Sequence, residues 1–162
     1  MKKFALISSM MVAISAVGAW ADCAKGAAGK YGALTIETVN GKCVATFDAT
    51  SEETLVVPKD FTVDKVVLNR GFNASAFGTT VLPISCSNFY YQHGALNKID
   101  RMEHYENGGR EVWQVHGEEF SSGIERENTP FLIRSYDGNP LEIIGNSPIT
   151  VHATSSEDNL SS

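Results

Sequence analysis

Short β-rich runs separated by turn residues constrain the fold of this chain most strongly. The clearest example is Leu34–Val39, followed by Asn40-Gly41 and then by Lys42–Phe47. Asn-Gly between two such arms is typical of a two-residue type I′ hairpin turn. Counting outward from the turn pairs three residues of each arm: Thr38 with Cys43, Ile36 with Ala45 and Leu34 with Phe47. Strand alternation puts these six side chains on one face, which we expect to point into the core.

The chain after Thr50 repeats this pattern. Runs rich in Val, Thr, Ile and aromatic residues are separated by Pro, Gly, Asn and Asp. The predicted strands are Thr54–Val57, Val63–Leu68, Thr79–Ile84, Phe89–Tyr91, Thr129–Arg134, Leu141–Ile144 and Ile149–Ala153. Their spacing predicts an all-β fold, an antiparallel β-sandwich of roughly 8–10 short strands.

The segment from Ala95 to Tyr105 fits two structures. Its apolar residues fit one face of a helix, but Asn107-Gly108-Gly109 followed by Arg110–Val115 fits the second arm of a hairpin. We favour the hairpin. With Asn107-Gly108 as its turn, the register places His104 opposite Glu111 and Tyr105 opposite Arg110.

The N-terminal 21 residues have the features of a signal peptide. A basic start, Lys2-Lys3, precedes an apolar run, and Ala19-Trp20-Ala21 is an A-x-A cleavage site. Cys23 also raises the alternative of a lipidated N-terminus, but Asp22 stands where that processing needs a small residue. Removal of residues 1–21 leaves 141 residues with a formal charge of −8. This charge argues against nucleic acid or an anionic membrane surface as partner.

The remaining chain is expected to form one domain. A length near 140 residues can bury roughly 70% of the unfolded surface, so a real core is feasible. We assign residues 22–153 to a single β-sandwich domain. Residues 154–162 have too little apolar content to pack, and we expect a disordered polar tail.

Three cysteines in an exported protein point to a disulfide, because the compartments outside the cytoplasm oxidise thiols. The expected bridge joins Cys23 to Cys43, because Cys43 would face inward and the bridge would hold the N-terminus. Cys43–Cys86 is the alternative pairing, and a fully reduced set comes last.

Recognisable catalytic sequence motifs are absent. The chain has no G-x-S-x-G, H-E-x-x-H, Walker or C-x-x-C motif, and we predict no catalytic residues, no metal site and no cofactor. The alternative is a small secreted hydrolase that uses His104, His116 and Glu111 on the same scaffold, since imidazole and carboxylate groups together support acid–base chemistry.

The run Asn88-Phe-Tyr-Tyr-Gln-His93 is the best candidate for ligand binding. Tyrosine rings beside Gln, Asn and His can stack on sugar rings and hydrogen-bond to their hydroxyls. In a strand Tyr90 and Tyr91 face opposite sides, so at least one of them is expected in the core. We name Tyr90, Tyr91 and His93 as the candidate ligand contacts.

Three segments resemble a recurrent β-rich module of secreted and surface proteins of gut and rumen bacteria. They are Thr62–Phe72, the T-x-x-L-P element Thr79–Ile84, and Asn128–Arg134, within a stretch of roughly residues 45–153. The resemblance implies an all-β extracellular domain of adhesin-like or polysaccharide-associated proteins, with no established catalytic activity. It supplies no functional residues.

These observations lead to one functional expectation. We expect an exported, non-enzymatic β-sandwich module for cell-surface interaction or extracellular assembly, with a carbohydrate as one candidate ligand. A polysaccharide or a surface protein would be its partner. The expected location is outside the cytoplasm of a bacterium: secreted, periplasmic or on the outer cell surface.

Overall fold

The computed structural model describes Cys23 and residues 27–71, 73–74, 77–119, 123–124 and 129–154. These residues form eleven strands and no helix, so the predicted all-β class is confirmed. The signal peptide predicted for residues 1–21, and the tail residues 155–162, lie outside the described part. A membrane-crossing helix is likewise not found among the described residues.

The strands differ widely in length. In chain order they are β1 Gly29–Tyr31, β2 Leu34–Val39, β3 Lys42–Asp48, β4 Phe61–Asn69, β5 Phe77–Leu82, β6 Ile84–Ser85, β7 Phe89–Gln92, β8 Gly94–Asn107, β9 Arg110–Glu119, β10 Thr129–Ser135 and β11 Leu141–Val151. The expectation of uniformly short strands is therefore wrong for β8 and β11.

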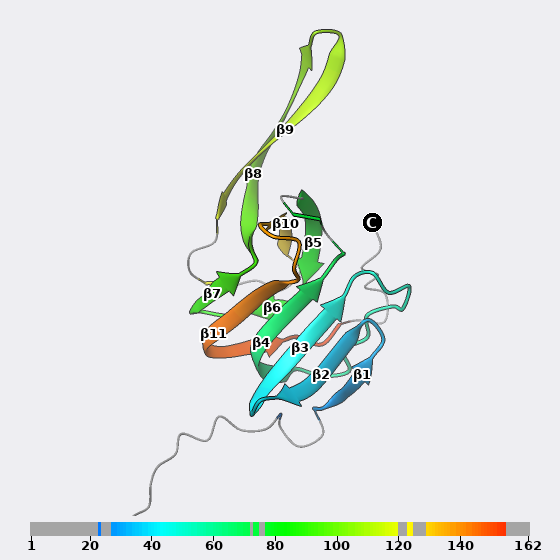
Figure 1. Cartoon of the computed structure of the whole chain (residues 1–162), viewed down its shortest axis with the longest axis vertical. Coiled ribbons are helices and arrows are strands. Elements are labelled where there is room, and N and C mark those ends of the chain that lie inside the picture. The colour runs from blue at the N-terminus through cyan, green and yellow to red at the C-terminus, as the bar shows by residue number, and fades with distance from the viewer. Residues whose placement is uncertain are drawn as a thin grey trace, which may run out of the picture.

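The strands form two open sheets (Figure 1). A seven-stranded sheet has the order β1-β2-β3-β4-β11-β6, and β7 also pairs with β11. A four-stranded sheet has the order β5-β10-β8-β9. Buried side chains of both sheets form one apolar cluster, so the architecture is sandwich-like.

The first hairpin has the predicted register. Thr38 pairs with Cys43, and the two further predicted pairs toward Phe47 also form. Asn40 and Gly41 have φ values of 51° and 73°, as a type I′ turn requires. Five of the six side chains on the predicted inner face are buried, whereas Thr38 lies beyond the core and is exposed.

The purely antiparallel arrangement predicted from the sequence is wrong at one place. Strands β3 and β4 pair in parallel. A parallel pair needs a crossover of about a dozen residues, and residues 49–60 provide it. The predicted strand Thr54–Val57 lies in this crossover and contributes a single bridge, between Leu55 and Gly32. Leu55 and Val57 are buried as anchors of the crossover.

The predicted strand Thr79–Ile84 is divided between the two sheets at Pro83. β5 pairs with β10 in the small sheet, and β6 pairs with β11 in the large sheet. Because proline has no N–H to donate to a ladder, it suits this point of transfer.

The two predicted C-terminal strands are one strand, β11. It pairs with β4 along one side, with a register shift between Ile144 and Ile149, and with β6 and β7 along the other. At this shift the backbone of Gly145 passes close to Ser147. A Cβ atom at position 145 would lie 2.2 Å from the Ser147 carbonyl oxygen, so another residue would require a backbone shift. The backbone N–H of Asn146 donates to the carbonyl oxygen of Asn88 at 2.9 Å.

The predicted hairpin in the middle of the chain is confirmed, but its turn lies one residue later than predicted. The predicted partners near the turn are therefore shifted by two residues, and His104 pairs with Trp113 rather than with Glu111. The turn consists of Gly108 and Gly109, with φ values of 61° and 78°. Tyr105 therefore pairs with Val112 rather than with Arg110.

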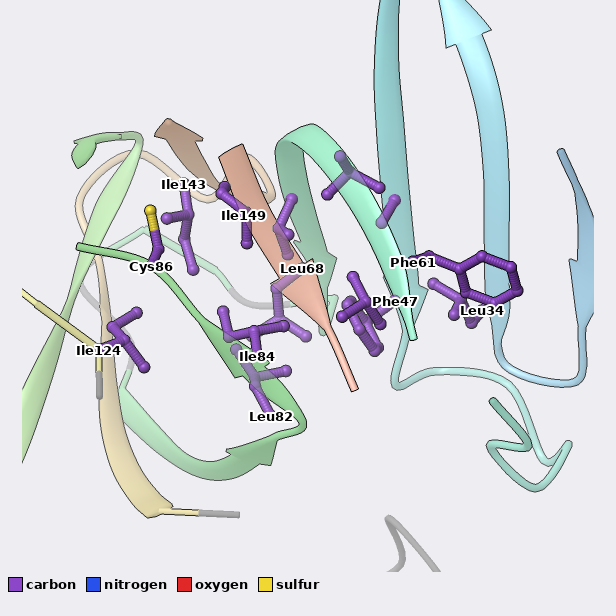
Figure 2. Packing of buried hydrophobic residues seen from close by; sticks show 14 of the residues in the cluster. Leu34, Phe47, Phe61, Leu68, Leu82, Ile84, Cys86, Ile124, Ile143 and Ile149 are labelled. Carbon is purple, nitrogen blue, oxygen red and sulfur yellow. The ribbon is translucent and has the colours of Figure 1, made fainter. Parts of the chain in front are cut away.

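The core lies where the inner faces of the strands meet (Figure 2). Leu34 and Phe47 are contributed by the N-terminal hairpin and Leu82, Ile84 and Ile149 by later strands, and all five are fully buried. At roughly 1.5–3 kcal/mol for each fully buried large side chain, this cluster supplies the main stabilisation.

The expected disulfide is also found. The sulfur atoms of Cys23 and Cys43 lie at a bonding distance of 2.13 Å. Cys86 is a buried free thiol, so the alternative Cys43–Cys86 pairing does not form. The bridge fastens the segment before β1 to β3.

Candidate functional site

The two tyrosines of the candidate binding run point to opposite sides of β7. Tyr91 packs against the core, with its ring edge-on to Phe89 at a centroid distance of 5.2 Å. Burial, and next the negative charge of Glu119, raise the pKa of the Tyr91 phenol well above its usual range. Tyr90 points outward, and 46% of its surface is exposed. The structure therefore leaves Tyr90 as the accessible ring of the pair.

Tyr90 stands among polar groups on the outer face of the large sheet. It pairs with Ile144 of β11, and Gln92 pairs with Glu142. On the other side of β11, Ile144 pairs with Lys65 of β4. Because directly paired residues share a face, these five side chains form one surface, which we call the Tyr90 face. Three neighbouring strands hold it, so it is part of the rigid sheet.

An ion pair organises the polar half of the Tyr90 face. Lys65 Nζ lies 2.8 Å from Glu142 Oε1, and the two side chains are 25% and 20% exposed. Partial burial restricts both side chains. The Lys65 N–H groups and the Glu142 oxygen that are not used in the pair therefore have defined positions on the same face as the Tyr90 ring. The arrangement can present one aromatic surface together with hydrogen-bonding groups of both kinds.

His93, the third candidate ligand contact, has an acidic partner. It lies at the bend between β7 and β8, where its Nδ1 atom is 2.7 Å from Asp137 Oδ2. Its carbonyl oxygen accepts a hydrogen bond from the Tyr136 N–H at 2.9 Å. The hydrogen bond from His93, and next that from Asn139, lower the pKa of Asp137 to about 2. His93 thus anchors the turn between β10 and β11.

Gly94 allows this corner to form. A Cβ atom at this position would lie 2.3 Å from the Arg134 carbonyl oxygen, which is too close for any other residue without a backbone shift. The start of β8 therefore approaches β10 closely enough to place His93 beside Asp137.

The structure separates the residues proposed for a hydrolase. His104 Nε2 is 3.7 Å from Glu111 Oε2, and His116 Nε2 is 3.3 Å from Glu103 Oε2. The register places these two pairs on opposite faces of the β8–β9 hairpin. His104 and Glu111 therefore lie together, whereas His116 is on the opposite face of the hairpin and cannot join them. Within the described residues, no cluster of three His, Cys, Asp or Glu side chains is suited to bind a metal ion.

A serine, a histidine and an aspartate that the sequence analysis missed do meet. Ser85 Oγ lies 2.8 Å from His152 Nε2, and His152 Nδ1 lies 3.3 Å from Asp60 Oδ2. The three residues come from the end of β6, the residue after β11 and the residue before β4. The only local signal was a serine and a histidine at the ends of predicted strands, and their proximity follows from strand pairing that the sequence does not reveal.

Comparison of the chain with protein-family models, with curated proteins and with solved structures gave no match. The fold and the Tyr90 face place the protein in a broad class, that of all-β modules with two open sheets and a polar-aromatic face on the larger one.

Proposed function

We propose that the protein is an exported binding module that holds a carbohydrate on the Tyr90 face. The observation that carries the proposal is the exposed Tyr90 ring beside Gln92 and the Lys65–Glu142 pair. The proposed location is the cell surface or the extracellular space of a bacterium, where the module takes part in cell-surface interaction or extracellular assembly.

The chemistry of this face suits a sugar. A pyranose ring has an apolar face of C–H groups, which packs on an aromatic ring, and a rim of hydroxyl groups. Each hydroxyl both donates and accepts hydrogen bonds. Glu142 offers acceptors, Lys65 offers donors and the Gln92 amide offers both. Charged partners make such bonds stronger than neutral ones do.

Two further features support a setting outside the cytoplasm. The first 21 residues have the composition of a signal peptide, and Cys23 and Cys43 lie at disulfide distance. Disulfides persist in oxidising compartments and are rare in the cytosol. The resemblance of residues 45–153 to modules of bacterial surface proteins agrees with this setting.

The test is retention of the purified protein on a panel of insoluble and soluble polysaccharides. We expect saturable binding to at least one of them. Tyr90→Ala should weaken that binding about tenfold or more, equivalent to ~1.4 kcal/mol. Gln92→Ala should weaken it as well, because the amide loses both of its hydrogen-bonding groups.

Tyr105→Ala is the matched control. Tyr105 is 42% exposed, close to the value of Tyr90, but it lies on the β8–β9 hairpin. This variant should bind like the unmodified protein. Absence of binding to every polysaccharide, or equal loss of binding in both tyrosine variants, would refute the proposal.

A further inference from the structure

We propose that Ser85, His152 and Asp60 form an acyl-transfer site that hydrolyses small carboxylic esters. This activity goes beyond carbohydrate binding and uses different residues. The proposal rests on the chain of contacts from Ser85 Oγ through the two ring nitrogens of His152 to Asp60. Nucleophile, base and orienting carboxylate are recognised by such geometry rather than by their order in the sequence.

The sheet register explains why these side chains come together. Ser85 pairs with Thr150, and Phe61 pairs with Val151. Since Val151 and Phe61 are buried, their neighbours on alternate positions, including His152 and Asp60, lie on the outer face of the sheet. The three side chains therefore occupy adjacent strand ends.

Separate hydrogen bonds hold the base and the carboxylate in place. The backbone N–H of His152 donates to the Pro83 carbonyl oxygen at 2.7 Å, and the N–H of Ala153 donates to Asp60 Oδ1 at 2.9 Å. The hydrogen bond from the Ala153 N–H is the largest cause of the lowered pKa of Asp60, and the hydrogen bond with His152 lowers this pKa further. Asp60 thus stays ionised and can orient the imidazole ring.

A substrate has access to the serine. Ser85 lines an open groove of about 570 Å³ together with Ser87, Pro148 and Thr150. This volume is within the range of small-molecule sites. Thr150 and Ser87 both line the groove and carry hydroxyl groups, which are the candidate donors to the oxygen of an ester carbonyl; Ser87 Oγ also lies 3.1 Å from Ser147 Oγ.

The reaction follows from these positions. Ser85 Oγ attacks the ester carbonyl carbon while His152 Nε2 takes the hydroxyl proton. The tetrahedral intermediate then breaks its bond to the alcohol oxygen, which leaves with that proton. Water attacks the resulting acyl-serine, again losing a proton to His152. The carboxylic acid is released and Ser85 regains its proton.

The test combines two measurements on the purified protein. A fluorophosphonate probe is added and the labelled residue is located by mass spectrometry, and the hydrolysis of p-nitrophenyl acetate is followed against buffer alone. We expect a single adduct on Ser85 and hydrolysis above background. Ser85→Ala should abolish both signals, and His152→Ala should slow labelling by about a hundredfold, the usual contribution of a general base.

Further variants separate catalysis from a structural role. Asp60→Asn keeps a similar shape and should slow labelling, whereas His104→Ala on the hairpin should leave it unchanged. Thermal unfolding of each variant shows whether it is folded. If the Ser–His–Asp network were purely structural, the probe would not label Ser85 of the folded protein. No adduct on Ser85 of the unmodified protein, or equal labelling rates with and without His152, would overturn the assignment. Neither result would affect the carbohydrate test, which uses a different readout.

Discussion

His93 has a backbone conformation that is uncommon for a residue with a side chain. Its φ of 67° is in the left-handed region, where histidine is better tolerated than β-branched residues but remains strained. The hydrogen bond between its ring and Asp137 compensates part of this strain, and the bend directs β8 away from β7 toward β10. The contact between His93 and Asp137 thus holds the corner between the two sheets together with the backbone bond from Tyr136.

The contact gives a prediction for acid stability. In the folded protein the pKa of Asp137 is lowered from 3.8 to about 2, first by the hydrogen bond from His93. A lowered pKa means that the carboxylate stabilises the fold above about pH 4 and that this contribution is lost as the pH falls from about 4 to about 2. Asp137→Asn should therefore unfold at a lower temperature than the unmodified protein at pH 6, with the difference vanishing near pH 2. Thermal unfolding followed by circular dichroism at each pH checks this, and an equal difference at both pH values would contradict it.

At the scale of the element, the β8–β9 hairpin extends away from the rest of the molecule (Figure 1). Pairing between β8 and β10 ends at Lys98, whereas pairing between β8 and β9 continues to Asn107. The outer part of the hairpin is thus a two-stranded ribbon. Such ribbons are only marginally stable alone, so we expect this part to open independently of the core.

Two glycines in equivalent turns test this independence. Gly109 at the tip of the projecting hairpin and Gly41 in the large sheet have φ values of 78° and 73°, and neither would bring a Cβ atom within 4 Å of another residue. Alanine costs roughly 1–2 kcal/mol in either turn because of its backbone conformation. Gly41→Ala should lower the free energy of global unfolding by about this amount. Gly109→Ala should instead accelerate amide hydrogen exchange in the hairpin with little global effect.

The two measurements are denaturant unfolding and hydrogen exchange. Equal loss of global stability in the two variants would show that the hairpin unfolds together with the core.

The two hairpins also show what the sequence can specify. Asn40-Gly41 offers one type I′ turn, so its register was predicted correctly. Asn107-Gly108-Gly109 offers two overlapping turns, Asn-Gly and Gly-Gly, and the chain uses the second. Local composition does not distinguish these frames, because both provide residues that accept positive φ.

Local sequence patterns also do not show which distant segments of the chain pair with one another. The parallel β3–β4 pair depends on how the crossover packs, and the meeting of Ser85 with His152 depends on the order of strands in the sheet. Alternation showed that Tyr90 and Tyr91 point apart, but only the pairing of β7 with β11, which turns Tyr91 toward the core, determines which one is exposed.

At the scale of the whole molecule, the disulfide gives a stability prediction. Cys23 and Cys43 are 20 residues apart, and closing a loop of this length contributes about 3 kcal/mol in the chain-entropy model. Reduction should lower the free energy of unfolding by about that amount. Urea unfolding with and without a reductant measures it. Cys86→Ala removes the free thiol and should leave this difference in place, whereas a Cys43–Cys86 peptide in a non-reducing digest would contradict the pairing.

The position of β11 has a consequence for the order of events during synthesis. This strand, the last of the described chain, lies between β4 on one side and β6 and β7 on the other. Until residues 141–151 leave the ribosome, β4 has a bare edge and the two halves of the large sheet have nothing to join them. Contacts so distant in sequence carry a high loop-closure cost and slow the search for the native state. The large sheet therefore stays incomplete until residues 141–151 have been made.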